Sequence, residues 1–105
     1  MIDQGYLGPV ALEATLRLAI QCRNGSHVIT APDAAPTWAI YGADDTALLT
    51  GSLGSSDADS KTGFRTGDAA ITAANGFAAG GRYTIRYFYE ISGTDYSVIQ
   101  TFTVV

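Results

Sequence analysis

Residues 82–105 read RYTIRYFYEISGTDYSVIQTFTVV, and this stretch decides the fold class. Apolar and polar residues alternate with a period of two on both sides of a glycine-containing turn, which is the pattern of an antiparallel hairpin. A turn centred on Gly93 and Thr94 would pair Ile91 with Tyr96 and continue the alternation to the end of the chain. We therefore expect a hairpin whose inner face carries aromatic and aliphatic side chains.

The outer face of this hairpin is mostly polar, but two residues on it are not. In the expected register Phe88 lies opposite Ile99, among charged residues, serines and threonines. An apolar pair on a polar sheet face either covers a neighbouring loop or marks a contact patch. Both alternatives stay open at this point, and Phe88 and Ile99 are candidate interface residues.

The rest of the chain repeats the pattern of short strands and turns. Alternation of the same kind covers residues 14–22, 37–41 and 46–53, and a weaker strand covers 64–72. Residues 54–63 are rich in Ser and Asp and are expected to form an exposed loop. No amphipathic helix is evident, so the fold class is all-β.

Trp38 suggests which all-β architecture this is. An immunoglobulin-like antiparallel β-sandwich of about seven strands places a tryptophan of its third core strand against the second and sixth strands. Trp38 lies between the strands that contain Leu18 and Ile85, and Tyr83 follows a Gly-Gly corner where such folds have a tyrosine corner. Cys22 is the only cysteine, so no intrachain disulfide closes the sandwich. We expect one such domain over residues 1–105.

The first twelve residues, 1–12, are a candidate N-terminal arm. Tyr6 and Leu7 stand beside Gly5, Gly8 and Pro9, a composition that suits a segment docked onto another subunit. A disordered terminus or one packed onto its own domain fits equally well. Tyr6 and Leu7 join the candidate interface residues.

Charge excludes several classes of function. Only 15% of the 105 residues are charged, against about 25% in typical domains, and the net charge is −4. The few Lys and Arg residues are scattered, which argues against direct nucleic-acid binding. The start of the chain has no signal-peptide pattern and no stretch is long enough to span a membrane, so we expect a protein made in the cytoplasm. A low content of charged residues is typical of the core of a protein–protein interface. It could equally reflect a source organism whose proteins are generally acidic and rich in alanine.

The residues that could carry chemistry do not form a catalytic or metal-binding pattern. His27 is the only histidine, and Cys22 follows the apolar spacing of its strand, which predicts a buried and inert thiol. Asp57 and Asp59 have a faint calcium-loop spacing, but Lys61 occupies a ligand position. We therefore expect no enzyme activity, no cofactor and no metal. The pair Asp44-Asp45 is typical of a turn, where Asp side chains accept hydrogen bonds from nearby backbone N–H groups.

A pattern of turn and core residues resembles small virion proteins of tailed bacteriophages. The resemblance covers about two-thirds of the chain, and it consists of Pro36 to Gly42, Leu48 to Leu53, Thr62 to Phe64, and Asn75 to Arg86. It implies a multicopy Ig-like module that is assembled in the host cytoplasm and binds other virion proteins of the capsid or the tail. Of these roles we expect capsid decoration (cement), with a head–tail or tail component as the alternative.

A function of a different class stays open beside the virion role. An Ig-like module could instead recognise a cell-surface glycan through exposed aromatic side chains, for which Trp38, Tyr87 and Tyr89 are the candidates. The alternation predicts that these three point inward, which makes their exposure the observation that separates the two functions.

Overall fold

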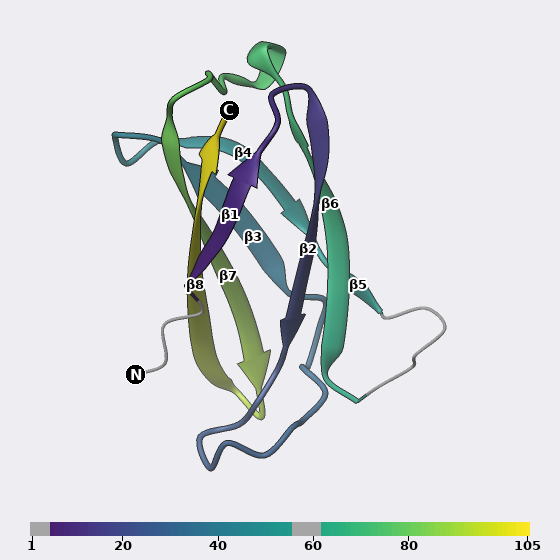
Figure 1. Cartoon of the computed structure of the whole chain (residues 1–105). Helices are drawn as coiled ribbons and strands as arrows, with labels where there is room; N and C mark the ends of the chain where they lie inside the picture. The colour runs from purple at the N-terminus through teal and green to yellow at the C-terminus, as the bar shows by residue number, and fades with distance from the viewer. Residues whose placement is uncertain (1–4, 56–61) are drawn as a thin grey trace.

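The computed structural model describes residues 5–55 and 62–105, which form two β-sheets packed face to face (Figure 1). One sheet has the strand order β1-β8-β7-β3-β4 and the other has the order β2-β6-β5. The elements are β1 (Tyr6–Val10), β2 (Ala14–Gln21), β3 (Thr37–Tyr41), β4 (Ala47–Ser52), β5 (Gly54–Ser55), β6 (Phe64–Ile71), the 3-10 turn η1 (Ala73–Asn75), β7 (Arg82–Ile91) and β8 (Thr94–Val104).

This strand order is that of an immunoglobulin-like sandwich without a disulfide. In constant-type domains of this fold, strands A, B, E and D form one sheet and C, F and G form the other. Here β2, β6 and β5 take the places of B, E and D, while β3, β7 and β8 take those of C, F and G. The predicted fold class is confirmed, with β4 added beside β3.

The core lies where the inner faces of the two sheets meet. Trp38 in β3 is 4% exposed, and Leu18 in β2 and Ile85 in β7 are 1% and 0% exposed, as their alternation predicts. The indole of Trp38 lies directly over Gly51 in β4, where a Cβ atom would approach the ring to 2.6 Å. The absence of a side chain at Gly51 is therefore what lets the tryptophan lie flat in the core.

The expected tyrosine corner is present at the end of the sandwich. The backbone N–H of Ala78 donates to Tyr83 Oη at 2.9 Å, so the phenol holds the connection that precedes β7. Phe77 from the same connection is 3% exposed and packs edge-on against the Tyr83 ring at 4.9 Å. Phe102 stacks on Tyr83 at 5.5 Å and lies 6.2 Å from Phe77, so the three rings form one cluster. These contacts pin the connection between β6 and β7 onto the core.

The β7–β8 hairpin has a different register from the expected one. Its two-residue turn is Ser92-Gly93 instead of Gly93-Thr94, so Tyr89 pairs with Tyr96 rather than with Val98. Each side chain still takes the expected face, because a shift of two residues preserves the alternation. The period of two determines faces, and only the turn determines the register.

The turn itself explains why this register is chosen. Ser92 and Gly93 adopt φ angles of 51° and 80°, and positive φ at both central residues is what a type I′ hairpin turn requires. Asp33, in the loop between β2 and β3, accepts hydrogen bonds from the N–H groups of both turn residues, at 3.0 and 3.1 Å. A residue sixty positions away in the sequence thus caps the hairpin.

The N-terminal segment packs onto its own domain. β1 pairs in parallel with β8, with Tyr6 beside Thr101 and Val10 beside Val104, and the register shifts between Tyr6 and Pro9. Of the three alternatives for this terminus, residues 6–10 adopt the self-packed one rather than a disordered segment or an arm that leaves the domain. Residues 1–4 lie outside the described part of the chain.

The expected loop over residues 54–63 is wrong at its start. Gly54–Ser55 forms β5, which pairs with Thr66 and Arg65 of β6. The polar composition of this stretch hid a strand that is only two residues long, too short for alternation to be visible. Residues 56–61, which include the calcium-like spacing of Asp57 and Asp59, lie outside the described residues.

Candidate functional site

Three of the four candidate interface residues, Tyr6, Phe88 and Ile99, lie on the outer face of the five-stranded sheet. Cross-strand pairing arranges it in rows, of which the central one runs from Ile99 through Arg86 and Ala39 to Thr50. A neighbouring row holds Phe88. The remaining outward positions of β3, β7 and β8 near these rows are mostly threonine and serine: Thr37, Thr84, Ser97, Thr101 and Thr103. The same face also carries the charged side chains Arg82, Arg86, Glu90 and Asp95 and a few large apolar ones.

Phe88 and Ile99 lie on this face but do not pair directly, which corrects the expected contact. Phe88 is opposite Ser97 and Ile99 is opposite Arg86, so the two apolar residues are diagonal neighbours. They are 38% and 45% exposed. The guanidinium carbon of Arg86 lies 5.6 Å from the centre of the Phe88 ring, a cation–π distance. Arg86 therefore sits at the centre of an aromatic and aliphatic cluster.

Tyr6 extends this cluster across the sheet, whereas Leu7 does not. Tyr6 pairs with Thr101, and its Oη is 2.6 Å from Thr103 Oγ1, so its ring lies on the outer face. The ring is 54% exposed. Leu7 is 40% exposed but follows Tyr6 in the strand and so projects to the opposite side of the sheet. We define the outer-face patch as Tyr6, Arg86, Phe88 and Ile99.

A shallow hollow of about 430 Å³ borders the patch where the β3–β4 turn folds beside Arg86 and Ile99. Asp44 and Asp45 belong to this turn, and Asp44 Oδ1 accepts the N–H of Thr46 at 3.0 Å, which is the expected turn chemistry. In the described part of the chain, Arg86 makes no ion pair with either of them. Its charge is thus available to a partner. The sequence did not single out Arg86, because basic residues were considered only where several of them stand together.

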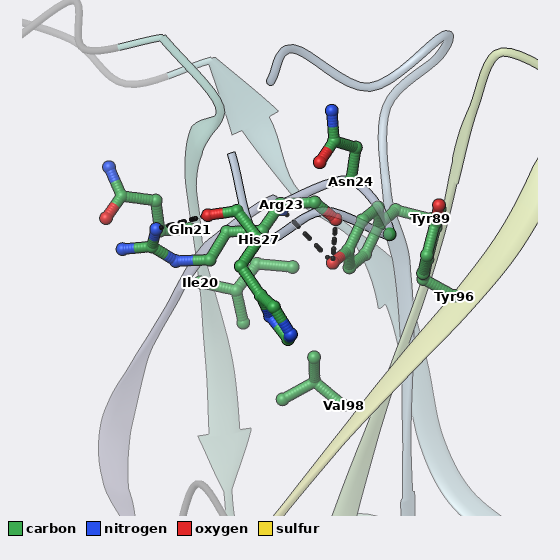
Figure 2. A pocket seen from close by; sticks show the side chains of 9 residues that line it. Ile20, Gln21, Arg23, Asn24, His27, Tyr89, Tyr96 and Val98 are labelled. Atoms are coloured by element: carbon green, nitrogen blue, oxygen red, sulfur yellow. Dashed lines mark hydrogen bonds between the residues drawn. The ribbon is translucent and has the colours of Figure 1, made fainter. Parts of the chain in front are cut away.

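A second concave site, of about 500 Å³, opens at the end of the sandwich where the β2–β3 loop meets β8 (Figure 2). Tyr89 Oη bonds to both the N–H and the C=O of Arg23, at 3.2 and 3.1 Å, and the Tyr96 ring stacks on Tyr89 at 5.4 Å. Arg23 Nη1 in turn donates to the carbonyl oxygen of His27 at 3.0 Å. These bonds hold the loop in place, so much of the polar lining already has a structural role.

The aromatic residues on which glycan recognition would depend are buried. Trp38, Tyr87 and Tyr89 are 4%, 0% and 9% exposed. Tyr87 Oη donates to Gln100 Oε1 at 2.7 Å inside the core, and burial raises the pKa of Tyr87 well above its ordinary value. Stacking of a sugar on Trp38 or Tyr87 would require the sandwich to open, and Tyr89 lines the concave site with little of its surface exposed.

Cys22 and His27, the two residues considered for nucleophilic or metal-binding chemistry, lie where a structural role predicts. Cys22 is fully buried, and desolvation raises the pKa of its thiol to about 11 while nearby Arg65 lowers it in part, so the thiol stays protonated at neutral pH. His27 lies in an exposed loop with a positive φ of 64°. Over residues 5–55 and 62–105 no three His, Cys, Asp or Glu side chains are grouped to hold a metal ion.

No protein-family model, curated protein or solved structure matches this chain. The described residues contain no helix long and apolar enough to cross a membrane.

Proposed function

We propose that this chain is a non-enzymatic structural protein of a bacteriophage virion, and specifically a capsid decoration protein present in many copies. It would be made in the host cytoplasm and bind other virion proteins through the outer-face patch. The single observation that supports this most is the patch itself, in which Arg86 lies over Phe88 on an exposed sheet face.

The chemistry of the patch suits a protein partner. Tyrosine, phenylalanine and arginine are enriched at protein–protein interfaces, and the aromatic ones bury large areas at a small cost in side-chain entropy. The serine and threonine side chains around them can hydrogen-bond across the contact, which offsets the cost of removing their hydroxyl groups from water. The rigid sheet beneath keeps these groups fixed before binding, which reduces the entropy lost on association.

The resemblance to tailed-phage virion proteins gives the partner class. The residues of that pattern form turns and core. The pattern is therefore more specific for the fold than for the location of the protein on the particle. A head–tail or tail component is the alternative, because the same flat face would serve at either place.

The test is sedimentation of the purified chain with purified capsids and, separately, purified tails of tailed phages that encode a chain of this sequence. Saturable binding to capsids, at a fixed number of copies per particle, is expected. Binding to tails alone would move the protein to the alternative location. Failure to sediment with either particle, together with binding to a glycan array, would overturn the proposal.

A further inference from the structure

One sheet edge of this sandwich is open to another strand. In the described residues the two sheets end at β1, β2, β4 and β5. β1 contains Pro9 and an irregular register, β4 pairs with β3 through a shifted register, and β5 is two residues long. Proline, bulges and shortness are the means by which proteins keep edges from pairing. β2 has none of these features.

The main chain of β2 presents unpaired groups along its whole length. β2 pairs with β6 in an uninterrupted register from Ala14 to Gln21 and contains neither proline nor glycine. Because Cys22 N–H points to Gly63 across the β6 side at 2.8 Å, the odd-numbered residues of the strand point the other way. Their unpaired N–H and C=O groups belong to Thr15, Arg17, Ala19 and Gln21.

Arg23 shows what these groups do when a partner is present. It is the next odd-numbered residue, and its N–H and C=O both bond to Tyr89 Oη from the opposite sheet. Tyr89 therefore ends the open edge just after Gln21. In the ABED arrangement of this fold, strand A would cover the edge, but the first described strand lies beside β8 instead.

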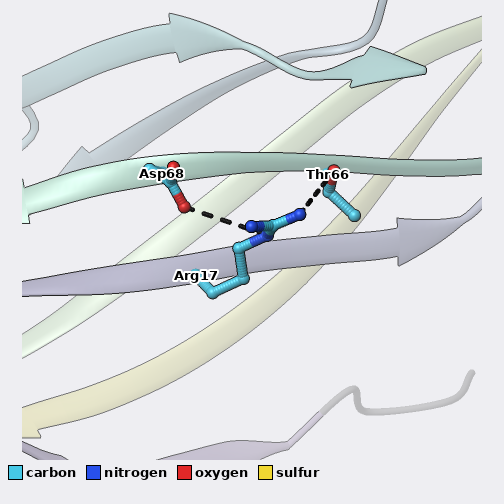
Figure 3. A network of polar contacts seen from close by, with 3 residues as sticks. All are labelled: Arg17, Thr66 and Asp68. Atoms are coloured by element: carbon cyan, nitrogen blue, oxygen red, sulfur yellow. Dashed lines mark hydrogen bonds and ion pairs between the residues drawn. The ribbon is translucent and has the colours of Figure 1, made fainter. Parts of the chain in front are cut away.

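The only charged side chain on β2 does not guard the edge. Arg17 Nη2 donates to Thr66 Oγ1 at 3.3 Å, and Arg17 Nε lies 3.8 Å from Asp68 Oδ1 (Figure 3). Both partners are on β6, so the guanidinium is drawn over the sheet and its charge is balanced there. A strand approaching from the open side meets an edge whose one charged side chain is already paired.

We propose that β2 pairs antiparallel with β2 of a second copy of this chain, centred on Leu18. In this register Arg17 lies opposite Ala19 and Thr15 opposite Gln21, so every outward main-chain group has a partner and no like charges face each other. On the inner face Leu16 comes beside Ile20. The result is one continuous sheet through a two-fold axis.

Charge complementarity at both ends supports a second copy as the partner. In the same register the exposed Arg23 of one copy lies opposite the exposed Glu13 of the other. The two-fold axis produces this pair twice. Glu13 Oε2 accepts a hydrogen bond from the N–H of Ala73, and Arg23 Nη1 donates one to the carbonyl oxygen of His27. The other carboxylate oxygen of Glu13 and the other guanidinium nitrogens of Arg23 can therefore form the contact. This inference concerns the chain alone and does not rest on the virion proposal.

The test is the oligomeric state of the purified chain combined with amide hydrogen exchange. Sedimentation equilibrium over rising concentration should show a monomer passing into a dimer. In the same series the amides of Thr15, Arg17, Ala19 and Gln21 should become protected together. A monomer throughout, or a dimer that protects other amides, would overturn the proposal.

Two variants of one residue separate this edge contact from a general effect on folding. Ala19→Lys places a cation opposite Arg17 of the other copy, twice, and should weaken dimerisation by roughly tenfold. Ala19→Glu makes the same change in size but faces Arg17 with an opposite charge, so it should dimerise at least as well as the parent. Equal effects of both variants on the dimer would also overturn the proposal, and the exchange pattern of the parent chain is a readout that needs neither variant.

Discussion

At the scale of single residues, the contact between Trp38 and Gly51 leaves no room for a side chain at position 51. The indole fills the space that a side chain at Gly51 would need, since a Cβ there would lie 2.6 Å from the ring. Interiors are close-packed, so the tryptophan can move aside only by disturbing the core around it. Alternation in the sequence predicted that Trp38 is buried, but nothing in the pattern of β4 pointed to the glycine beneath it.

Gly51→Ala should therefore destabilise the protein by about 1–3 kcal/mol, the usual cost of overpacking a core. Gly54→Ala is the matched control, because a Cβ at Gly54 meets nothing within 4 Å. We expect the control to change stability by no more than about 0.5 kcal/mol. Urea unfolding of both variants measures the difference, and equal midpoints would contradict the packing described for Trp38.

The buried thiol of Cys22 makes stability depend on pH. Its pKa is raised from 9.0 to about 11 in the folded chain, so on raising the pH the unfolded chain loses the thiol proton first. The free energy of unfolding should then fall as the pH rises from about 9 towards 11, with the raised pKa of Tyr87 adding to the fall at the upper end. Cys22→Ala should flatten this decline. Urea unfolding at a series of pH values tests it, and identical slopes for parent and variant would refute the role of the thiol.

At the scale of elements, the β7–β8 hairpin shows what a sequence pattern can determine. Its period of two predicted both strands and the face of every side chain, because burial selects one parity. It did not predict the register, which depends on positive φ at Ser92 and Gly93 and on hydrogen bonds from both of them to Asp33. A contact that spans sixty positions leaves no local trace in the sequence.

Asp33→Ala should cost about 1–3 kcal/mol, because both turn N–H groups lose a charged acceptor. Asp95→Ala is the control: it removes the same charge beside the same turn, at an exposed position opposite Glu90. Thermal unfolding of the two variants is the measurement. If Asp95→Ala were as damaging as Asp33→Ala, the capping of the turn would not be what Asp33 contributes.

At the scale of the whole molecule, the two sheets have different outer surfaces. The five-stranded sheet carries the outer-face patch, and the three-stranded sheet carries the open edge of β2. Phe88 and Ile99 were predictable as interface candidates because large apolar residues at outward positions are visible in the alternation, whereas Tyr6 was proposed from the composition of residues 1–12. Their arrangement around Arg86 was not, since it depends on the register of β7 against β8 and on β1 folding back beside β8.

The central claim is that the outer-face patch binds a virion partner, and one pair of charge reversals tests it most directly. Arg86→Glu reverses the charge inside the patch, while Arg17→Glu makes the same change at an exposed position on the other sheet. Both variants have the same net charge, so a difference between them reports the location and not the overall field. In sedimentation with purified capsids, we predict that Arg86→Glu loses at least about tenfold in affinity, as truncated or reversed interface arginines do, while Arg17→Glu stays within about twofold of the parent. Equal affinities for the two variants and the parent would contradict the claim.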